Sequence, residues 1–522
     1  MHPPFMLLYI FLNLIATTSS VRVPQTAENA TAVEAPNPWF YVMVIDAGSS
    51  GSRMKVFQYR LPSPVINSSA TDSIDRYIVC ISYSALAPSS VVKSLLALVE
   101  YAKGRLAAVR PFWKYFPVYL RATAGMRDVV PARRDALMHE CIRYLKETPF
   151  YFREDYAQVL SGEEEAAFGW LSLNADNRTL AGYDQDASLG WLDMGGASFQ
   201  IAFVPTRSHY VLQNLFPLAL SPKGYSSIRL YTKSYLHYGL VEANRRVSAA
   251  IISKELLRVD SVSTINNPCY FKGMDYQPDF ATALFPNTAG NKCAALVRQL
   301  FGSSTTTCWV RDCTFDGVYQ PRIDNTRFVA VSNFATVADS LGLHATGSLE
   351  EWHQATRRVC SMPYDEFTTM YAHVKRRRRD GLCFDSTYLY VLLSEFLKFG
   401  SAVNTTLEFR KYTRSGIELD WTSGSVTYTA SATPTTTISA YRKAVSMASV
   451  ASQEGFLGET SEEALNATFG ETGLRGIAPF FMDEVFPPFS NDDELQEEIE
   501  LEELLLSREP RLASMPELEI MT

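Results

Sequence analysis

The sequence YVMVIDAGSSGSRMKVFQY (Tyr41–Tyr59) places a carboxylate and a run of small residues between two apolar segments. Each apolar segment has the length and composition of a β-strand. The connection is rich in glycine and serine, whose backbone N–H groups and hydroxyls can surround an anion. We interpret the stretch as a strand, a phosphate-binding turn and a return strand, with Asp46 placed to interact with a metal ion.

A second stretch, LGWLDMGGASFQIAFV (Leu189–Val204), repeats this pattern, so that Asp46-Ala-Gly-Ser-Ser aligns with Asp193-Met-Gly-Gly-Ala. One such turn is a common hairpin connection, in which the aspartate merely caps the turn. Two of them predict two related lobes that face each other across a cleft. We expect a polyphosphate chain and a bridging divalent cation between the lobes. Asp46 and Asp193 would reach the cation through its water ligands, because hard cations prefer oxygen.

Both turns supply the residue types that an anion site needs. Their glycines are expected to permit positive φ angles and close approach of backbone N–H groups to phosphate: Gly48, Gly51, Gly195 and Gly196. Their serines add hydroxyl donors: Ser49, Ser50, Ser52 and Ser198.

The segment VLSGEEEAAFGWLSLN (Val159–Asn174) contains three consecutive glutamates. A solvated helix start is the usual meaning of such a run. Ser161 and Glu164 have the S-x-x-E spacing of a capping box, and Glu163 is expected to be exposed. Glu165 has no capping role and precedes the apolar sequence AAFGW. We therefore predict that Glu165 is the general base that accepts a proton from an attacking water.

The motif RATAGMR (Arg121–Arg127) follows an apolar strand-like run. Thr123 can donate a hydrogen bond to a phosphate oxygen. One of the two arginines can do so as well, or Arg127 can form a surface salt bridge instead.

Length and composition limit the class of protein. A chain of 522 residues predicts two domains, and a net charge of -8 argues against a nucleic-acid partner. Residues 1–20 have the short apolar run and small residues of a cleavable signal peptide, with a short signal anchor as the alternative. No other window supplies 18 apolar residues, so we expect no C-terminal membrane span. Five glycosylation sequons agree with the secretory pathway: Asn29, Asn67, Asn177, Asn404 and Asn466.

Six of the eight cysteines fall between residues 269 and 383. In an oxidising compartment this clustering predicts disulfides within one lobe, although sequence alone does not fix the connectivity. Local pairing gives Cys269–Cys293, Cys308–Cys313 and Cys360–Cys383. The two remaining cysteines can pair with each other or stay free: Cys80 and Cys141.

Strand-like and helix-like segments alternate to about residue 480, which predicts an α/β architecture. We expect a flexible leader over 21–38, lobe I over 39–160 with a C-terminal return at about 425–480, lobe II over 161–424 and an acidic tail over 486–522. The segment SVVKSLLALVEYAKGRLAAV has helical spacing of apolar residues. The Ser- and Thr-rich segment 422–440 is predicted to be a loop or a strand with an insertion. Lys375–Arg379 is interpreted as an exposed loop, with an anion site or a processing site as alternatives.

Four blocks resemble, in the same order, the apyrase conserved regions of the nucleoside triphosphate diphosphohydrolase family: IDAGSSGSRMKVF, YLRATAGMR, LSGEEEAAFGW and WLDMGGASFQIAF. The segment DGVYQPRIDNTRFVAVSNF is similar to the weaker fifth block, and LDWTSG is similar to another family segment. The resemblance covers roughly residues 40–430. It implies an α/β fold of two ribonuclease-H-like (actin/hexokinase-type) lobes with a nucleotide cleft between them.

The resemblance also implies hydrolysis of terminal phosphates of nucleoside tri- or diphosphates with Ca²⁺ or Mg²⁺. Carried over by motif position, Glu165 is the base, Ser198 and Gln200 hold the water, and Asp46 and Asp193 organise the water shell of the metal. The phosphate-binding positions implied in this way are Ser49, Ser50, Gly51, Ser52, Arg53, Thr123, Gly195, Gly196 and Ala197.

Two residues depart from the family pattern: Ala166 follows the implied base where glycine is usual, and Phe199 stands where threonine is usual. The fifth block is degenerate, which leaves recognition of the base open. Phe334 and Tyr388 are candidates for stacking on the base, and each can equally belong to the hydrophobic core.

We expect in-line attack by water on the terminal phosphorus without a phosphoenzyme. Two alternatives are an exopolyphosphatase-like hydrolase and a catalytically weak nucleotide-binding protein. The expected location is extracellular, with the Golgi or endoplasmic reticulum lumen as alternatives. The sequence does not indicate the preferred nucleotide, the ratio of ATPase to ADPase activity or the oligomeric state.

Overall fold

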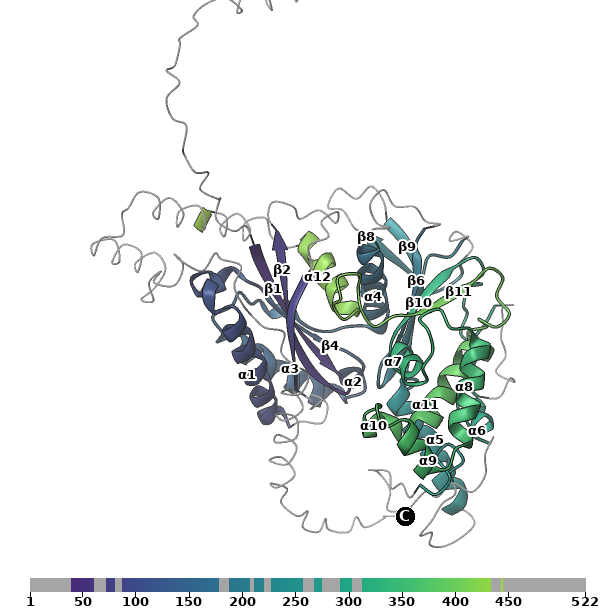
Figure 1. Cartoon of the computed structure of the whole chain (residues 1–522). Helices are drawn as coiled ribbons and strands as arrows, with labels where there is room; N and C mark the ends of the chain where they lie inside the picture. Colours follow the sequence, from purple (N-terminus) through teal and green to yellow (C-terminus); the bar gives the residue numbers. More distant parts are fainter. Residues whose placement is uncertain are drawn as a thin grey trace, which may run out of the picture. The chain divides into compact units, whose positions relative to one another are not determined.

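The computed structural model describes residues 39–60, 72–79, 87–177, 187–206, 211–219, 227–256, 267–274, 292–302, 312–432 and 443–444. All of them belong to one compact unit, residues 1–464. The predicted signal peptide, leader and acidic tail lie outside the described residues. Within the unit, helices pack around two separate β-sheets (Figure 1).

The first sheet has five strands in the order β3-β2-β1-β4-β5. β1 pairs antiparallel with β2, and β2 with β3, whereas β1–β4 and β4–β5 are parallel. The bounds are β1 (Trp39–Gly48), β2 (Gly51–Arg60), β3 (Asp72–Val79), β4 (Val118–Ala122) and β5 (Ala157–Val159).

The second sheet has six strands in the order β11-β10-β6-β7-β9-β8. β6 pairs antiparallel with β7 and parallel with β10, as β1 does with β2 and β4. The two sheets therefore share one strand plan, which confirms the predicted pair of ribonuclease-H-like lobes. The bounds are β6 (Leu189–Met194), β7 (Ser198–Phe203), β8 (Leu215–Ala219), β9 (Ser227–Leu236), β10 (Arg327–Ser332) and β11 (Thr406–Phe409).

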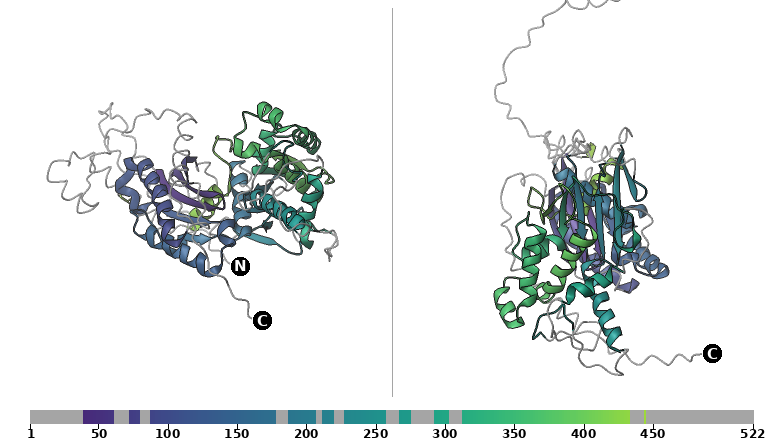
Figure 2. Two further views of the ribbon diagram at one scale, coloured as in Figure 1. Left: turned by 90° about the horizontal axis from the view of Figure 1, so that it is seen from below. Right: turned by 90° about the vertical axis from the view of Figure 1, so that its right-hand side faces the viewer.

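Helices accompany each sheet (Figures 1 and 2). α1 (Pro88–Arg105), which confirms the helix predicted from periodicity, and α3 (Pro131–Lys146) lie beside the first sheet. Between β4 and α3 the chain forms the short α2 (Ala124–Arg127). The second lobe carries α5 (Leu240–Leu256), α6 (Cys293–Leu300), α7 (Asn333–Ser340), α8 (Leu349–Ser361), α9 (Tyr364–Met370), α10 (Arg376–Arg379) and α11 (Leu382–Val391). Shorter segments are 3₁₀-helical at Ala107–Tyr115, Glu154–Tyr156 and Phe315–Gly317, and π-helical at Leu392–Phe396.

Two helices pack against each other between the sheets: α4 (Gly162–Asp176) and α12 (Trp421–Ala432) (Figure 1). α4 contacts β6, β7 and β9, whereas α12 contacts β1. The two backbones approach so closely that a methyl group on Gly424 would lie 1.9 Å from the carbonyl oxygen of Phe168. This helix pair therefore joins the two lobes.

The prediction of a loop or strand from residue 422 is wrong, because α12 occupies its first part. Asp420 accepts hydrogen bonds from the backbone N–H and the hydroxyl of Thr422, at 2.9 and 2.5 Å, which caps the first turn. Burial against α4 then outweighs the modest helix propensity of serine and threonine.

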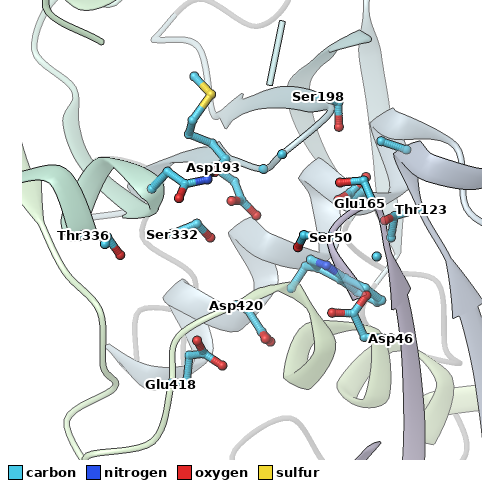
Figure 3. A pocket seen from close by; sticks show the side chains of 18 of the residues that line it. Asp46, Ser50, Thr123, Glu165, Asp193, Ser198, Ser332, Thr336, Glu418 and Asp420 are labelled. Atoms are coloured by element: carbon cyan, nitrogen blue, oxygen red, sulfur yellow. Dashed lines mark hydrogen bonds between the residues drawn. The ribbon is translucent and has the colours of Figure 1, made fainter. Parts of the chain in front are cut away.

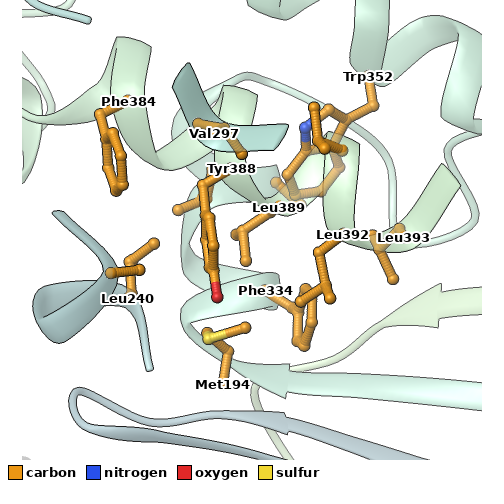
Figure 4. Close-up of a cluster of buried hydrophobic side chains, with 14 of the residues drawn as sticks. Met194, Leu240, Val297, Phe334, Trp352, Phe384, Tyr388, Leu389, Leu392 and Leu393 are labelled. Carbon is orange, nitrogen blue, oxygen red and sulfur yellow. The ribbon is translucent and has the colours of Figure 1, made fainter. Parts of the chain in front are cut away.

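The second lobe contains a large hydrophobic cluster, part of which is drawn in Figure 4. Disulfides link Cys269 to Cys293 and Cys360 to Cys383, as local pairing predicts. Cys313 is also in a disulfide, and its predicted partner lies outside the described residues. Cys141 is a free, buried thiol.

Two of the five sequon asparagines lie in the described part of the chain. Asn177 donates to the Leu173 carbonyl oxygen at 2.8 Å, and Asn404 is exposed. The other three sequons lie outside the described residues. Among the residues that the structure describes, we find no helix of the length and hydrophobicity needed to cross a membrane.

Candidate active site

The hairpin turns of the two sheets lie next to each other. In the first, Gly48 pairs with Gly51 and encloses the two-residue turn Ser49-Ser50. A methyl group on Gly196, in the turn between β6 and β7, would lie 3.0 Å from the Ser49 Oγ. The repeated sequence pattern therefore brings two glycine-rich turns, one from each lobe, together at one place.

A cavity of about 360 Å³ lies at this junction (Figure 3). Most of the predicted site residues line it: Asp46, Ser49, Ser50, Arg53, Thr123, Glu165, Asp193, Gly195, Gly196, Ala197 and Ser198. These residues come from β1, β2, α4, β6, β7 and the connections that follow β1, β4 and β6. The cavity is thus built from both lobes, with the acidic side chains directed into it.

Three of the predicted catalytic and phosphate-binding residues do not line the cavity. Ser52 is fully buried and lies outside the cavity lining, so the structure does not support a phosphate contact by its hydroxyl. Gly51 closes the hairpin turn with φ 150°, a conformation that favours glycine. Gln200 lies behind the cavity wall, where it donates to Glu165 Oε2 at 3.3 Å and to Ser198 Oγ at 2.5 Å.

The glycines of the two turns are needed mainly because a larger side chain would not fit. Of the four glycines predicted to have positive φ, only Gly51 has it. At Gly48, an added methyl group would lie 3.1 Å from the carbonyl oxygen of Gly51 and 3.0 Å from Arg53 Nη1. The prediction of positive φ is therefore wrong for the other three, whereas tight packing is seen at both turns.

Two of the three glutamates at the start of α4, Glu164 and Glu165, have different roles. The capping box is confirmed, because the Glu164 N–H donates to Ser161 Oγ at 3.1 Å and the Ser161 N–H donates to Glu164 Oε2 at 2.8 Å. Glu165 is only 7% exposed and faces the cavity. Burial raises the pKa of Glu165 above its ordinary value, and the Arg127 guanidinium opposes that rise.

The two aspartates at the strand ends lie in a strongly acidic environment. Burial raises the pKa of Asp193 to about 7, and the charge of Glu165 adds to the rise. Burial likewise raises the pKa of Asp46 to about 6, although Arg53 opposes it. Like charges confined in one cavity are stabilised by a divalent cation, so the donor set fits one. No group of three acidic, histidine or cysteine side chains in the described residues is close enough to hold a metal directly, which is compatible with binding through water.

The arginines of the RATAGMR motif point to different partners. Arg127 Nη2 donates to Glu165 Oε2 at 2.8 Å and to Ser198 Oγ at 3.1 Å. Arg121 instead donates to Gln158 Oε1 at 2.8 Å. Arg127 therefore forms a salt bridge, but it is a buried one to the predicted base and not the surface salt bridge considered for it.

Sequence reasoning missed a third group of polar residues, at the end of β10. Ser332 is the last residue of this strand and Asn333 follows it, and both line the cavity with Thr336 (Figure 3). A hydrogen bond from Ser332 lowers the pKa of Asp193, against the larger effect of burial. Ser332 has φ 56°, an unfavourable backbone conformation for a residue other than glycine. The available signal was the strand-then-polar order of VAVSNF in the degenerate fifth block.

A second missed group lies just before α12. Glu418 and Asp420 line the cavity, and both pair with the buried Lys55 of β2. These residues belong to the segment around LDWTSG, whose similarity to the family assigned no role to them.

The base-stacking candidates are not in the cavity. Phe334 and Tyr388 are both 0% exposed and lie in the core of the second lobe (Figure 4). The Tyr388 hydroxyl donates to the Tyr238 carbonyl oxygen at 2.6 Å. Their burial contradicts a stacking role and favours the alternative of core packing. Phe199 is also a core residue, stacked on Tyr235, so this departure from the family pattern does not reshape the cavity wall.

Two basic residues and an exposed tyrosine also line the cavity. Arg378, Lys411 and Tyr412 line it, and Tyr412 is 57% exposed. Arg378 belongs to the exposed basic run, which forms the short helix α10 and not the predicted loop.

Residues 33–447 match the GDA1/CD39 (nucleoside phosphatase) family. The match spans most of the chain and includes both sheets and both glycine-rich turns. The chain belongs to the GDA1/CD39 (nucleoside phosphatase) family, and it is a hydrolase of that family.

Individual relatives agree with this assignment. Ectonucleoside triphosphate diphosphohydrolase 8 of Bos taurus is 30% identical over 73% of this chain and 81% of the relative. The guanosine-diphosphatase of Schizosaccharomyces pombe is 28% identical over 68% and 67% of the two chains. A crystal structure of nucleoside triphosphate hydrolases from Neospora caninum has a TM-score of 0.53 at 15% identity, covering 79% of this chain and 95% of that one, which shows the shared fold.

Proposed function

We propose that this protein hydrolyses the terminal phosphates of nucleoside tri- or diphosphates, down to the monophosphate, with the help of Ca²⁺ or Mg²⁺. The observation that carries the proposal is the meeting of two glycine-rich turns, from different sheets, at a cavity that also holds a buried glutamate. Relatives named as triphosphate diphosphohydrolases, apyrases and a guanosine-diphosphatase support this substrate class.

In this mechanism the chain binds the phosphate tail between its two turns. Backbone N–H groups of the turns, with Ser49, Ser50 and Thr123, donate to phosphate oxygens. Arg53 is held beside the first turn, since it donates to Asp46 at 3.4 Å and to Ser50 at 3.4 Å. These donors neutralise charge on the phosphoryl group as it is transferred, which is the main source of catalysis in this reaction class.

Glu165 is proposed to orient and deprotonate the attacking water. Its carboxylate faces the cavity from the first turn of α4, while its neighbour Glu164 is committed to the helix cap. The water attacks the terminal phosphorus directly, so no phosphoenzyme forms. A buried carboxylate with a raised pKa is a stronger base than an exposed one, which suits proton abstraction near neutral pH.

Asp46 and Asp193 are the residues that would hold the divalent cation, through its waters. When bound, the cation supplies positive charge next to the phosphate chain. The remaining chemistry, binding, orientation and proton transfer, is assigned to the chain's own side chains.

Release of inorganic phosphate from a panel of nucleotides tests this proposal. Purified protein with Ca²⁺ or Mg²⁺ is expected to release phosphate from nucleoside tri- or diphosphates, and EDTA is expected to abolish the release. Tripolyphosphate without a nucleoside is included in the panel. Hydrolysis of tripolyphosphate alone would favour the exopolyphosphatase alternative, and binding of nucleotide without release would favour the binding protein.

A further inference from the structure

Arg127 connects the two lobes at the predicted base. It is the last residue of α2, which directly follows β4 of the first sheet. Its three hydrogen bonds reach the second lobe and the approach to it: the Leu160 carbonyl oxygen at 3.1 Å, Glu165 Oε2 at 2.8 Å and Ser198 Oγ at 3.1 Å. The side chain of Arg127 is 14% exposed and that of Glu165 is 9% exposed, so the ion pair is shielded from water.

The hydrogen-bond contacts of the Glu165 carboxylate fall on one of its two oxygens, Oε2. Arg127 donates to Oε2 at 2.8 Å, and Gln200 Nε2, which is also within hydrogen-bond distance of Ser198 and Ser234, lies 3.3 Å from the same oxygen. Within the described part of the chain, no hydrogen bond to Oε1 occurs. Because Glu165 lines the cavity, Oε1 is the carboxylate oxygen left to accept a hydrogen bond from a water there.

The Ser198 hydroxyl accepts hydrogen bonds from its protein neighbours, which leaves its own hydrogen to be donated. Ser198 Oγ accepts from Arg127 at 3.1 Å and from Gln200 at 2.5 Å. A hydroxyl has two acceptor lone pairs and one hydrogen, so both lone pairs are used. The remaining Ser198 O–H is therefore a donor, and Ser198 also lines the cavity.

Glu165 also needs a counter-charge. Asp193 on β6 and Asp46 on β1 line the same cavity, and each carries a charge that interacts unfavourably with Glu165. Arg127 is the cation in contact with Glu165 among the described residues. Removing one partner of a buried, hydrogen-bonded ion pair leaves the other charge uncompensated.

We propose that Arg127 is a positioning residue that, together with Gln200, presents Glu165 Oε1 as the acceptor and the Ser198 hydroxyl as the donor for the attacking water. This inference rests on the proposed function. It assigns Arg127 no contact with the nucleotide, because Arg127 does not line the cavity. The proposal also explains why the lobes must be in contact here. Arg127 of α2 can orient Glu165 of α4 and Ser198 of β7 only where these elements meet.

The test compares Arg127→Ala and Arg127→Lys with Arg143→Ala, which removes an exposed ion pair with Glu140 on α3. Arg127→Ala is expected to lower kcat by roughly 100-fold or more with little change in KM, as for loss of a proton-transfer partner. Added guanidinium ion is expected to restore part of the kcat of Arg127→Ala and to leave Arg143→Ala unchanged. Arg127→Lys should keep a minor share of activity, because an ammonium group does not reproduce the fork of a guanidinium.

The double variant Arg127→Ala/Ser198→Ala adds a second readout. If Arg127 acts through Ser198 and Glu165, the two losses should be clearly less than multiplicative. A raised KM with unchanged kcat would overturn the proposal and would place Arg127 on the phosphate. Equal activity of Arg127→Ala and Arg143→Ala would overturn it as well. If thermal unfolding shows that Arg127→Ala does not fold, Arg127→Lys is used instead. A lower kcat with an unchanged KM then supports the proposal, and a raised KM with an unchanged kcat overturns it. Failure of the wild-type protein and of Arg143→Ala to release phosphate would instead contradict the proposed function itself.

Discussion

Three buried carboxylates in the cavity are expected to lower the stability of the fold when they are charged. The carboxylates of Asp46, Asp193 and Glu165 are all buried, and burial raises the pKa of each. A carboxylate whose pKa is higher in the folded than in the unfolded state contributes stability at low pH. That contribution is lost as the pH rises through the folded-state pKa. The site should therefore be a source of instability at neutral pH until a cation is bound.

Asp193→Asn tests this argument directly. Burial raises the pKa of Asp193 from 3.8 to about 7, so the folded protein holds this proton more tightly than the unfolded chain does. In EDTA at pH 8, we expect Asp193→Asn to melt at a higher temperature than the wild type, and the difference to shrink towards pH 4. Added Mg²⁺ or Ca²⁺ should raise the melting temperature of the wild type more than that of the variant. Thermal unfolding at several pH values measures both, and a lower melting temperature of the metal-free variant at pH 8 would contradict the argument.

Ser332 combines an unfavourable backbone with a useful side chain. Its φ of 56° favours glycine, and its hydroxyl bonds to Asp193. Ser332→Gly is expected to stabilise the fold by about 1 kcal/mol by relieving strain, and to lower activity because Asp193 loses its donor. Ser332→Ala should lower activity to the same extent without the gain in stability. If both variants keep full activity, the hydroxyl does not position Asp193.

At the level of elements, the contact between α4 and α12 depends on one glycine. A methyl group on Gly424 would lie 1.9 Å from the Phe168 carbonyl oxygen, which the helices can accommodate only by moving apart. Gly424→Ala is expected to destabilise the protein by about 1–3 kcal/mol, as overpacking does. Gly104 in α1 has no atom within 4 Å of an added methyl group, so Gly104→Ala should be neutral or stabilising by up to about 1 kcal/mol. Denaturant unfolding of the two variants checks this, and equal stability would show that the helices do not need the close contact.

The elements also show what the sequence could predict. Both hairpins, the capping box at Ser161 and Glu164, and the helix at 88–105 follow from local patterns: alternation, cap spacing and helical periodicity. α12 could not be predicted in this way. Its serines and threonines favour other structures locally, and its helix depends on burial against α4, which is distant in the sequence.

For the molecule as a whole, the repeat of Asp46 and Asp193 was the most informative feature, because two similar strand-turn-strand units predict two similar sheets. The two sheets do share one strand plan. Contacts between segments that are distant along the chain could not be predicted from the sequence. The partner of Arg127 depends on how the lobes meet, and Ser332 became visible only once β10 was seen to lie parallel to β6. Phe334 and Tyr388 have the composition of either a core or a binding platform, and burial alone distinguishes the two.

Two adjacent glutamates on α4 allow the most direct test of the account, because they differ in role but not in chemistry. We predict that Glu165→Gln lowers the turnover of a nucleoside triphosphate by roughly 100-fold or more while nucleotide affinity stays near that of the wild type. Glu164→Gln should keep most of the turnover and lose about 1 kcal/mol of stability through a weaker cap. The measurement is kcat for phosphate release by the two variants, side by side with nucleotide binding. A Glu165→Gln enzyme that retains half of the wild-type rate, or a Glu164→Gln enzyme that is the inactive one, would contradict Glu165 as the base.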